Sequence, residues 1–116
     1  MNNKVWYYFD LAGKLTVAKN NSRSFLLGSI GLRKDGALVS AINSISQTPN
    51  RQLHSEYRLS RKLDKGSIVF VARVRLLNGE FAEAKPCFSC EKALRNKGVK
   101  RVFYTISHNE YGVIDL

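Results

Sequence analysis

Two short stretches of this chain carry the residue types that bind metal ions and move protons. His54-Ser55-Glu56 offers an imidazole and a carboxylate, and Pro86-Cys87-Phe88-Ser89-Cys90 offers two thiols. Imidazole nitrogen and thiolate sulfur are ligands that zinc prefers, and three protein ligands leave the fourth tetrahedral position open, as in catalytic sites. The chain has only 2 cysteines and 2 histidines. This pattern therefore predicts a catalytic zinc site with His54, Cys87 and Cys90 as ligands.

The spacing within each stretch predicts the element that carries it. Cys87 and Cys90 stand at i and i+3, so on a helix they share one face. Pro86 has no backbone N–H and suits the start of a helix, which places both thiols in the first turn. The helix dipole and the N–H groups there favour thiolate, the form that binds metal. His54 and Glu56 stand at i and i+2, so both reach one ion only if His54 begins a helix.

The motif H-x-E followed by P-C-x-x-C resembles that of the zinc-dependent nucleoside and nucleobase deaminases, and both halves are complete here. The resemblance implies that His54, Cys87 and Cys90 hold one Zn²⁺ per chain and that Glu56 is the catalytic general acid and base. It also implies hydrolytic conversion of cytosine to uracil, or of adenine to hypoxanthine in related enzymes. We expect cytosine, because the variant of this family with a C-terminal hairpin consists mostly of cytosine and cytidine deaminases.

The same resemblance assigns substrate contacts. Asn43 stands eleven residues before His54, an offset at which nucleoside and tRNA-adenosine deaminases carry an asparagine that contacts the sugar. Alternatively, Asn43 satisfies backbone groups at the end of a strand. Three further residues beside the ligands are expected to contact the substrate: Ser55, Pro86 and Phe88. Ile45 replaces a glutamate that grips the ribose hydroxyls in free-nucleoside deaminases, which counts against free cytidine as the substrate.

The charge of the chain bears on what carries the cytosine. Its formal net charge is +10, with a pI of 10.0, which is typical of proteins that bind polyanions through phosphate contacts. The alternative is a basic domain with no polymeric partner. The expected nucleic-acid contacts are Arg23, Arg73, Arg75, Lys85, His108 and Tyr111. We therefore predict cytosine in a polynucleotide, single-stranded or flipped out of a duplex, with DNA favoured over RNA. Free dCMP or cytidine is the second prediction.

A function of another class also accommodates the two cysteines. His108 could complete a Cys₂His₂ set with His54, Cys87 and Cys90. The zinc would then be structural, and the chain would be a nucleic-acid-binding module without catalytic activity. This alternative gives Glu56 no role.

Hydrophobic periodicity and turn residues predict an α/β fold in a single domain over residues 1–116. Helices are expected over 1–19, 53–65 and 87–97, and strands over 24–33, 37–45, 67–74, 102–106 and 111–116. Asp35-Gly36 predicts a hairpin, and Gly98 ends the last helix. The short final connection makes the last two strands antiparallel. We expect three layers, with a mixed five-stranded sheet covered by about three helices. This arrangement matches the cytidine-deaminase-like fold, in its short form with a C-terminal hairpin, that the motif implies.

The sequence also bears on location. No apolar run approaches the ~20 residues that cross a bilayer, so no membrane partner is expected. Both cysteines are assigned to a metal, which leaves none for a disulfide and predicts a reducing, cytoplasmic setting.

Overall fold

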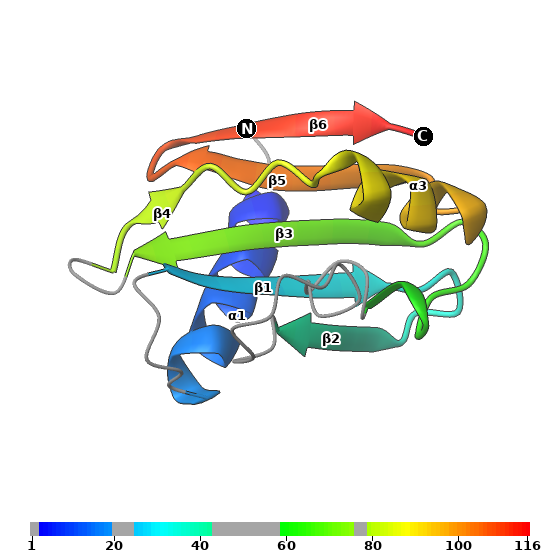
Figure 1. Cartoon of the computed structure of the whole chain (residues 1–116). Coiled ribbons are helices and arrows are strands. Elements are labelled where there is room, and N and C mark those ends of the chain that lie inside the picture. The colour runs from blue at the N-terminus through cyan, green and yellow to red at the C-terminus, as the bar shows by residue number, and fades with distance from the viewer. Residues whose placement is uncertain (1–2, 20–24, 43–58, 76–78) are drawn as a thin grey trace.

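The computed structural model describes residues 3–19, 25–42, 59–75 and 79–116. These residues form an α/β fold, with a mixed six-stranded sheet between two helices (Figure 1). The elements are α1 (Asn3–Lys19), β1 (Phe25–Leu32), β2 (Leu38–Ile42), β3 (Ile68–Arg75), β4 (Phe81–Ala82), α3 (Phe88–Asn96), β5 (Arg101–Ser107) and β6 (Glu110–Asp115). The strand order is β2-β1-β3-β5-β6, with β4 beside β3. β3 and β5 run parallel, and the other pairs are antiparallel.

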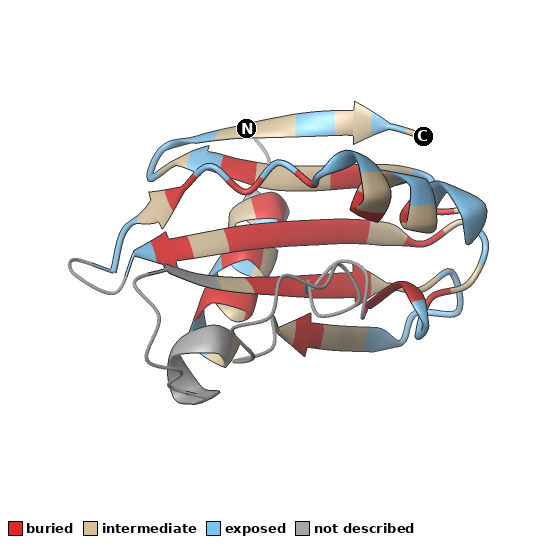
Figure 2. Cartoon of the chain, in the orientation of Figure 1, coloured by how far each residue is buried: buried red, intermediate tan, exposed pale blue. Residues whose placement is uncertain are grey.

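The central strand β3 is covered on both faces, as its continuous apolar run predicts. Val69 and Val71 belong to a buried cluster that includes Leu94 of α3. Phe70 and Ala72 point to the other face, where their cluster includes residues of α1. Because side chains alternate along a strand, this division places α1 and α3 on opposite faces of the sheet. In Figure 1, α1 lies behind the sheet and α3 in front of it, and Figure 2 shows buried residues along β3.

Both predicted hairpin connections are confirmed. β1 and β2 pair antiparallel up to Leu32 and Leu38, and Gly36 between them has φ of 93°, a conformation that glycine adopts without strain. β5 and β6 are also antiparallel. The predicted end of the last helix is confirmed as well, because Gly98 follows α3 with φ of 81°.

Two predictions are corrected. The sheet has six strands rather than five, because β4, only 2 residues long, pairs with the end of β3. The helix predicted over 53–65 lies partly outside the described residues, and in its described part only Leu59 and Ser60 are helical. Lys62 N donates to Leu59 O (2.8 Å), an i to i+3 bond that tightens the chain out of the α-helix. The prediction that this helix reaches Lys65 was therefore wrong.

The first helix, predicted over 1–19, is confirmed as α1 within its described bounds. Val5, Phe9 and Ala12 are buried against the sheet, as their spacing predicts. Gly13 lets the helix approach closely, because a Cβ there would lie 3.2 Å from Val74 Cγ2. Neither α1 nor α3 is long and apolar enough to cross a membrane.

Candidate metal and substrate site

The segment that leads into α3 is held between two strands of the sheet. The parallel pairing of β3 with β5 is recorded as far as Val71 and Tyr104, and beyond it β4 pairs with the end of β3. Ala84 N then donates to Thr105 O of β5 (2.8 Å). The chain that follows reaches Cys87 from a backbone fixed on both sides.

Thr105 joins the three strands at this point. Its fully buried hydroxyl donates to Ala82 O (2.7 Å), and the backbone N–H of Arg73 donates to the same hydroxyl oxygen (3.3 Å). The buried hydroxyl thus adds hydrogen bonds to backbone groups of β3 and β4 where these strands meet β5. No local pattern in the sequence indicated this role, because both partners lie far away along the chain.

The two cysteines meet at the start of α3, as predicted. Cys87 is the residue before the helix, and its carbonyl oxygen accepts the N–H of Glu91 (2.9 Å). Cys90 is 0 % exposed, whereas Cys87 is exposed. Their sulfur atoms lie 3.3 Å apart. Pro86 is buried directly before them. One thiol is therefore held in the core, and the other is open to solvent beside it.

This pair of thiols fits a zinc ion. A disulfide would need its sulfur atoms at about 2.05 Å. Two sulfur ligands at about 2.3 Å from a tetrahedral zinc lie about 3.8 Å apart. The observed 3.3 Å is within a small side-chain rotation of that spacing. The i, i+3 pair thus has the donor chemistry and the geometry of half of a zinc site.

The other half of the motif lies outside the described residues. His54 and Glu56 belong to this part of the chain, as do the expected substrate residues Asn43 and Ser55 and the expected nucleic-acid contact Arg23. Within the described ranges, no three His, Cys, Asp or Glu side chains form a group that could hold a metal. His108 is described, so the structure does not bring it to the two cysteines as the Cys₂His₂ alternative requires.

Leu59 is the first described residue after the His54-Ser55-Glu56 stretch. Leu59 and Leu63 pack over Gly31 of β1, where any Cβ would collide with Leu63. Leu59 belongs to the same buried cluster as Leu94 of α3. The first described residue after the H-x-E stretch therefore lies on the face of the sheet that carries the cysteines, as a shared site requires.

A turn after Leu63 fixes this segment. The Ser67 hydroxyl donates to Asp64 Oδ1 (2.6 Å), and the backbone N–H of Lys34 donates to the same carboxylate (3.2 Å). The bond from Ser67, then that from Lys34, and the nearby charge of Arg33 hold the pKa of Asp64 below its ordinary value. The segment is thus tied to the β1–β2 hairpin by interactions that favour an ionised carboxylate.

Several predicted substrate and nucleic-acid residues lie around α3. Phe88 is 78 % exposed and follows Cys87 directly. Lys85 is exposed just before the cysteines. Arg73 and Arg75 alternate with Val74 on β3, so they share the face of Val69 and Val71, on which α3 packs. Lys85, Arg73 and Arg75, which were predicted to contact nucleic acid, thus lie on the side of the sheet that carries α3 and the two cysteines.

Tyr111 and His108 are placed differently. The Tyr111 ring packs 5.8 Å from that of Trp6 and 5.8 Å from that of Phe9, within the cluster on the α1 face. His108 is exposed, with its ring 5.8 Å from that of Phe81, a residue of the same cluster. The structure therefore does not bring Tyr111 or His108 together with the cysteines, and it gives Tyr111 a packing role.

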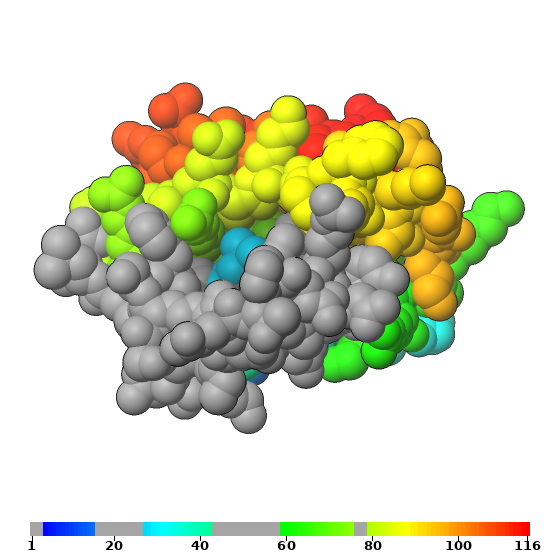
Figure 3. All heavy atoms as spheres, in the orientation of Figure 1, coloured from blue at the N-terminus to red at the C-terminus, as the bar shows by residue number. Residues whose placement is uncertain are grey.

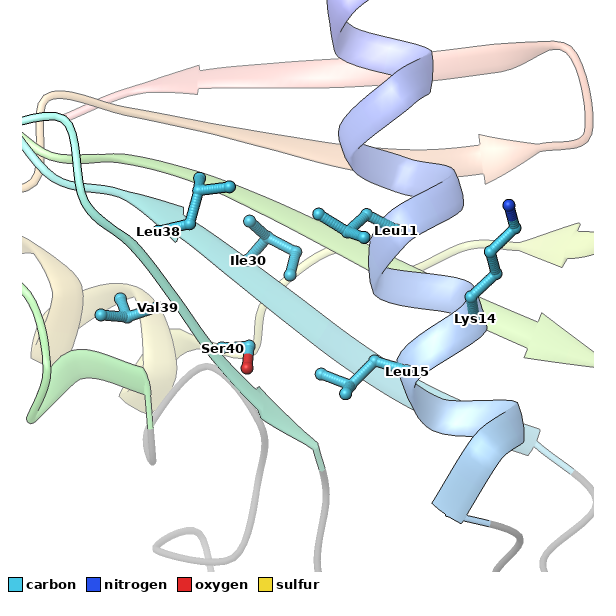
Figure 4. A pocket seen from close by; sticks show the side chains of 7 residues that line it. All are labelled: Leu11, Lys14, Leu15, Ile30, Leu38, Val39 and Ser40. Atoms are coloured by element: carbon cyan, nitrogen blue, oxygen red, sulfur yellow. The ribbon is translucent and has the colours of Figure 1, made fainter.

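A pocket of about 390 Å³ lies on the α1 side, between that helix and the β1–β2 hairpin (Figure 4). Its lining is mostly apolar, with Leu11, Leu15, Ile30 and Leu38, and it includes the polar residues Lys14 and Ser40. None of the predicted site residues that the structure describes lines it. The pocket is therefore separate from the candidate site.

Neither the comparison with protein-family models nor the search of curated proteins found a match for this chain. Its function is therefore argued from the motif and from the geometry of the described residues.

Proposed function

We propose that this protein is a zinc-dependent hydrolytic deaminase that converts cytosine to uracil in a single-stranded polynucleotide, with the three-layer fold of cytidine deaminases. One observation carries the proposal: Cys87 and Cys90 present their sulfur atoms 3.3 Å apart at the start of α3, in the complete P-C-x-x-C motif. Leu59, just after H-x-E, lies in the cluster that also holds Leu94 of α3. This placement supports a site shared by the two halves of the motif.

His54, Cys87 and Cys90 would hold the zinc ion, which when bound supplies an activated water near neutral pH. Glu56 would take a proton from the attacking water and give it to N3 of the cytosine ring, which makes C4 more electrophilic. After the resulting hydroxide adds to C4, Glu56 would carry the proton of the new C4 hydroxyl group to the amino group, which leaves as ammonia, so cytosine and water become uracil and ammonia. Proton transfer of this kind contributes about 10²- to 10⁴-fold in rate. Asn43 would hold the sugar.

The location of positive charge supports a polynucleotide over a free nucleotide. A mononucleotide needs one or two cations, whereas the chain carries a net charge of +10. Arg73 and Arg75 share the sheet face of α3, and Lys85 is exposed beside Cys87. Such cations can track the backbone of a single strand.

Substituting the proton-transfer residue tests the proposal directly. The zinc-loaded wild type is incubated with cytidine, dCMP, and single- and double-stranded DNA and RNA, and uracil is measured. We expect uracil in single-stranded DNA from the wild type and from the control Glu110→Ala, an exposed carboxylate in β6. Glu56→Ala should give none while it keeps about one zinc per chain, since Glu56 is not a ligand.

Two results would contradict parts of this proposal. If folded, zinc-loaded Glu56→Ala still deaminates cytosine, the mechanism assigned to Glu56 is wrong. If the wild type has no activity on any of these substrates, the proposal that the protein is a deaminase is wrong. Turnover of dCMP or cytidine with no product from oligonucleotides would keep the enzyme but exclude the polynucleotide. The basic residues would then be an ordinary solvated surface.

A further inference from the structure

The outer side of α3 combines one aromatic ring with several cations. Phe88, Lys92 and Arg95 recur at i, i+4 and i+7 on the exposed side, while Cys90 and Leu94 are buried on the inner side. Lys85 is exposed three residues before Phe88. Figure 3 shows α3 and the segment leading into it at the surface of the face that carries the site.

The ring of Phe88 is exposed and is not needed for the packing of α3. At 78 %, it is the most exposed of the large hydrophobic side chains in the described ranges. The helix gains its packing from Cys90 and Leu94, both 0 % exposed. A single exposed apolar residue is ordinary on a protein surface. This one, however, directly follows a proposed zinc ligand and stands between two lysines.

We infer that Phe88 is a stacking platform for the base next to the reactive cytosine in a single strand, with Lys85 and Lys92 neutralising the adjacent phosphates. An aromatic ring stacks on any base, and flanking cations hold the backbone, which is how single strands are bound without strict sequence readout. The assignment of the neighbouring base to this subsite rests on the proposed function. The ring-and-lysine surface itself binds the strand whether or not chemistry follows.

This subsite favours a polymer over a monomer. A free nucleotide has no neighbouring base to stack on Phe88, and it has no second phosphate for the more distant lysine. The stacking contact therefore acts only on polynucleotides. Arg95, further along the same side, is already paired with Glu91 (3.2 Å), so the phosphate contacts are assigned to the two lysines.

Three substitutions at one position isolate the ring. Phe88→Ala removes the side chain, Phe88→Leu keeps an apolar group without a ring, and Phe88→Trp restores an aromatic surface. Because Phe88 is 78 % exposed, we expect all three to fold with the thermal midpoint of the wild type. Tyr7→Ala is the matched control, since Tyr7 is an aromatic residue that is 59 % exposed on α1, across the sheet.

The probe is a single-stranded oligodeoxynucleotide with one cytosine beside 2-aminopurine, a fluorescent base that stacking quenches. Binding by fluorescence anisotropy should weaken about 5- to 150-fold in the Ala and Leu variants, the range that base stacking spans. The quenching should disappear with it. Phe88→Trp and Tyr7→Ala should bind as the wild type does. The ratio of kcat/KM for the oligonucleotide to kcat/KM for dCMP should fall in the Ala and Leu variants.

The possible results separate this inference from the deaminase proposal. Equal affinity and equal quenching in the wild type and in Phe88→Leu would overturn the inference, even if the protein deaminates cytosine. If binding depends on the ring but no deamination is detected, the stacking surface is supported and the deaminase proposal is contradicted.

Discussion

The two cysteines differ in burial, so removing each should have a distinct effect on the metal-free fold and the same effect on zinc binding. Cys90 is 0 % exposed and Cys87 is exposed. When a chelator removes the metal, Cys90→Ala should destabilise the protein, whereas Cys87→Ala should not. In excess zinc, each variant should lose the stabilisation that the metal gives to the wild type.

The magnitudes follow from burial and chain length. Deleting a buried sulfur is comparable to deleting a buried methyl group, about 1 kcal/mol. An exposed substitution usually changes stability by less than about 0.5 kcal/mol. For 116 residues, an unfolding entropy of ~2.1 cal/mol/K per residue gives about 4 °C in Tm per kcal/mol. Zinc at about 100 times its Kd adds about 2.7 kcal/mol, which corresponds to about 11 °C.

Differential scanning calorimetry gives the Tm of the wild type and of each variant, both with a chelator and with excess zinc, and the zinc content of each protein is measured in parallel. The metal-free Tm of Cys90→Ala should be about 4 °C below that of the wild type. Adding zinc should raise the Tm of the wild type only. If zinc raises the Tm of either variant as much as that of the wild type, that cysteine is not a ligand. Equal loss of stability in both metal-free variants would contradict the burial on which this reasoning depends.

Three further predictions concern other parts of the structure. Thr105→Val should lower the free energy of unfolding, measured with urea, by about 1–3 kcal/mol, because it removes the two hydrogen bonds that the buried hydroxyl makes with Ala82 O and Arg73 N; unchanged stability would exclude this role. Acid should destabilise the wild type more than Asp64→Asn. Because the pKa of Asp64 is lower in the folded protein, its contribution to stability is present above about pH 3.9 and is lost as the pH falls through the folded pKa. If urea unfolding at a series of pH values shows the same loss of stability in the wild type and in Asp64→Asn, this prediction is wrong. If Arg75 contacts a phosphate, Arg75→Ala should reduce the slope of log affinity against log salt by about 0.7 on single-stranded DNA, and an unchanged slope would exclude the contact.

The sequence was sufficient to predict those structural features that depend on interactions between residues close together in the chain. Asp35-Gly36 marks the β1–β2 hairpin because the turn needs a glycine with positive φ, and Gly36 has φ of 93°. The i, i+3 spacing of Cys87 and Cys90 placed the two thiols together because a helix turn brings such residues to one side. The zinc site as a whole, predicted from residue types, stays a prediction, and its His54 and Glu56 half lies outside the described residues.

Tertiary structure decided the features that depend on distant residues. Tyr111 pairs with Thr105 in the register that begins at Arg101 and Asp115, and this register places Tyr111 with Phe103 in the cluster on the α1 face. Alternation within one strand shows which residues share a face, but the pairing with neighbouring strands decides which face that is, so the sequence of this strand alone could not assign Tyr111 to the α1 face. Leu63 likewise packs over Gly31 of β1, a contact between segments that are far apart in the sequence. The sequence determined which side chains could do the chemistry, because that depends on residue type. The tertiary structure decided which of them share a face, because that depends on strand register and on contacts between distant segments.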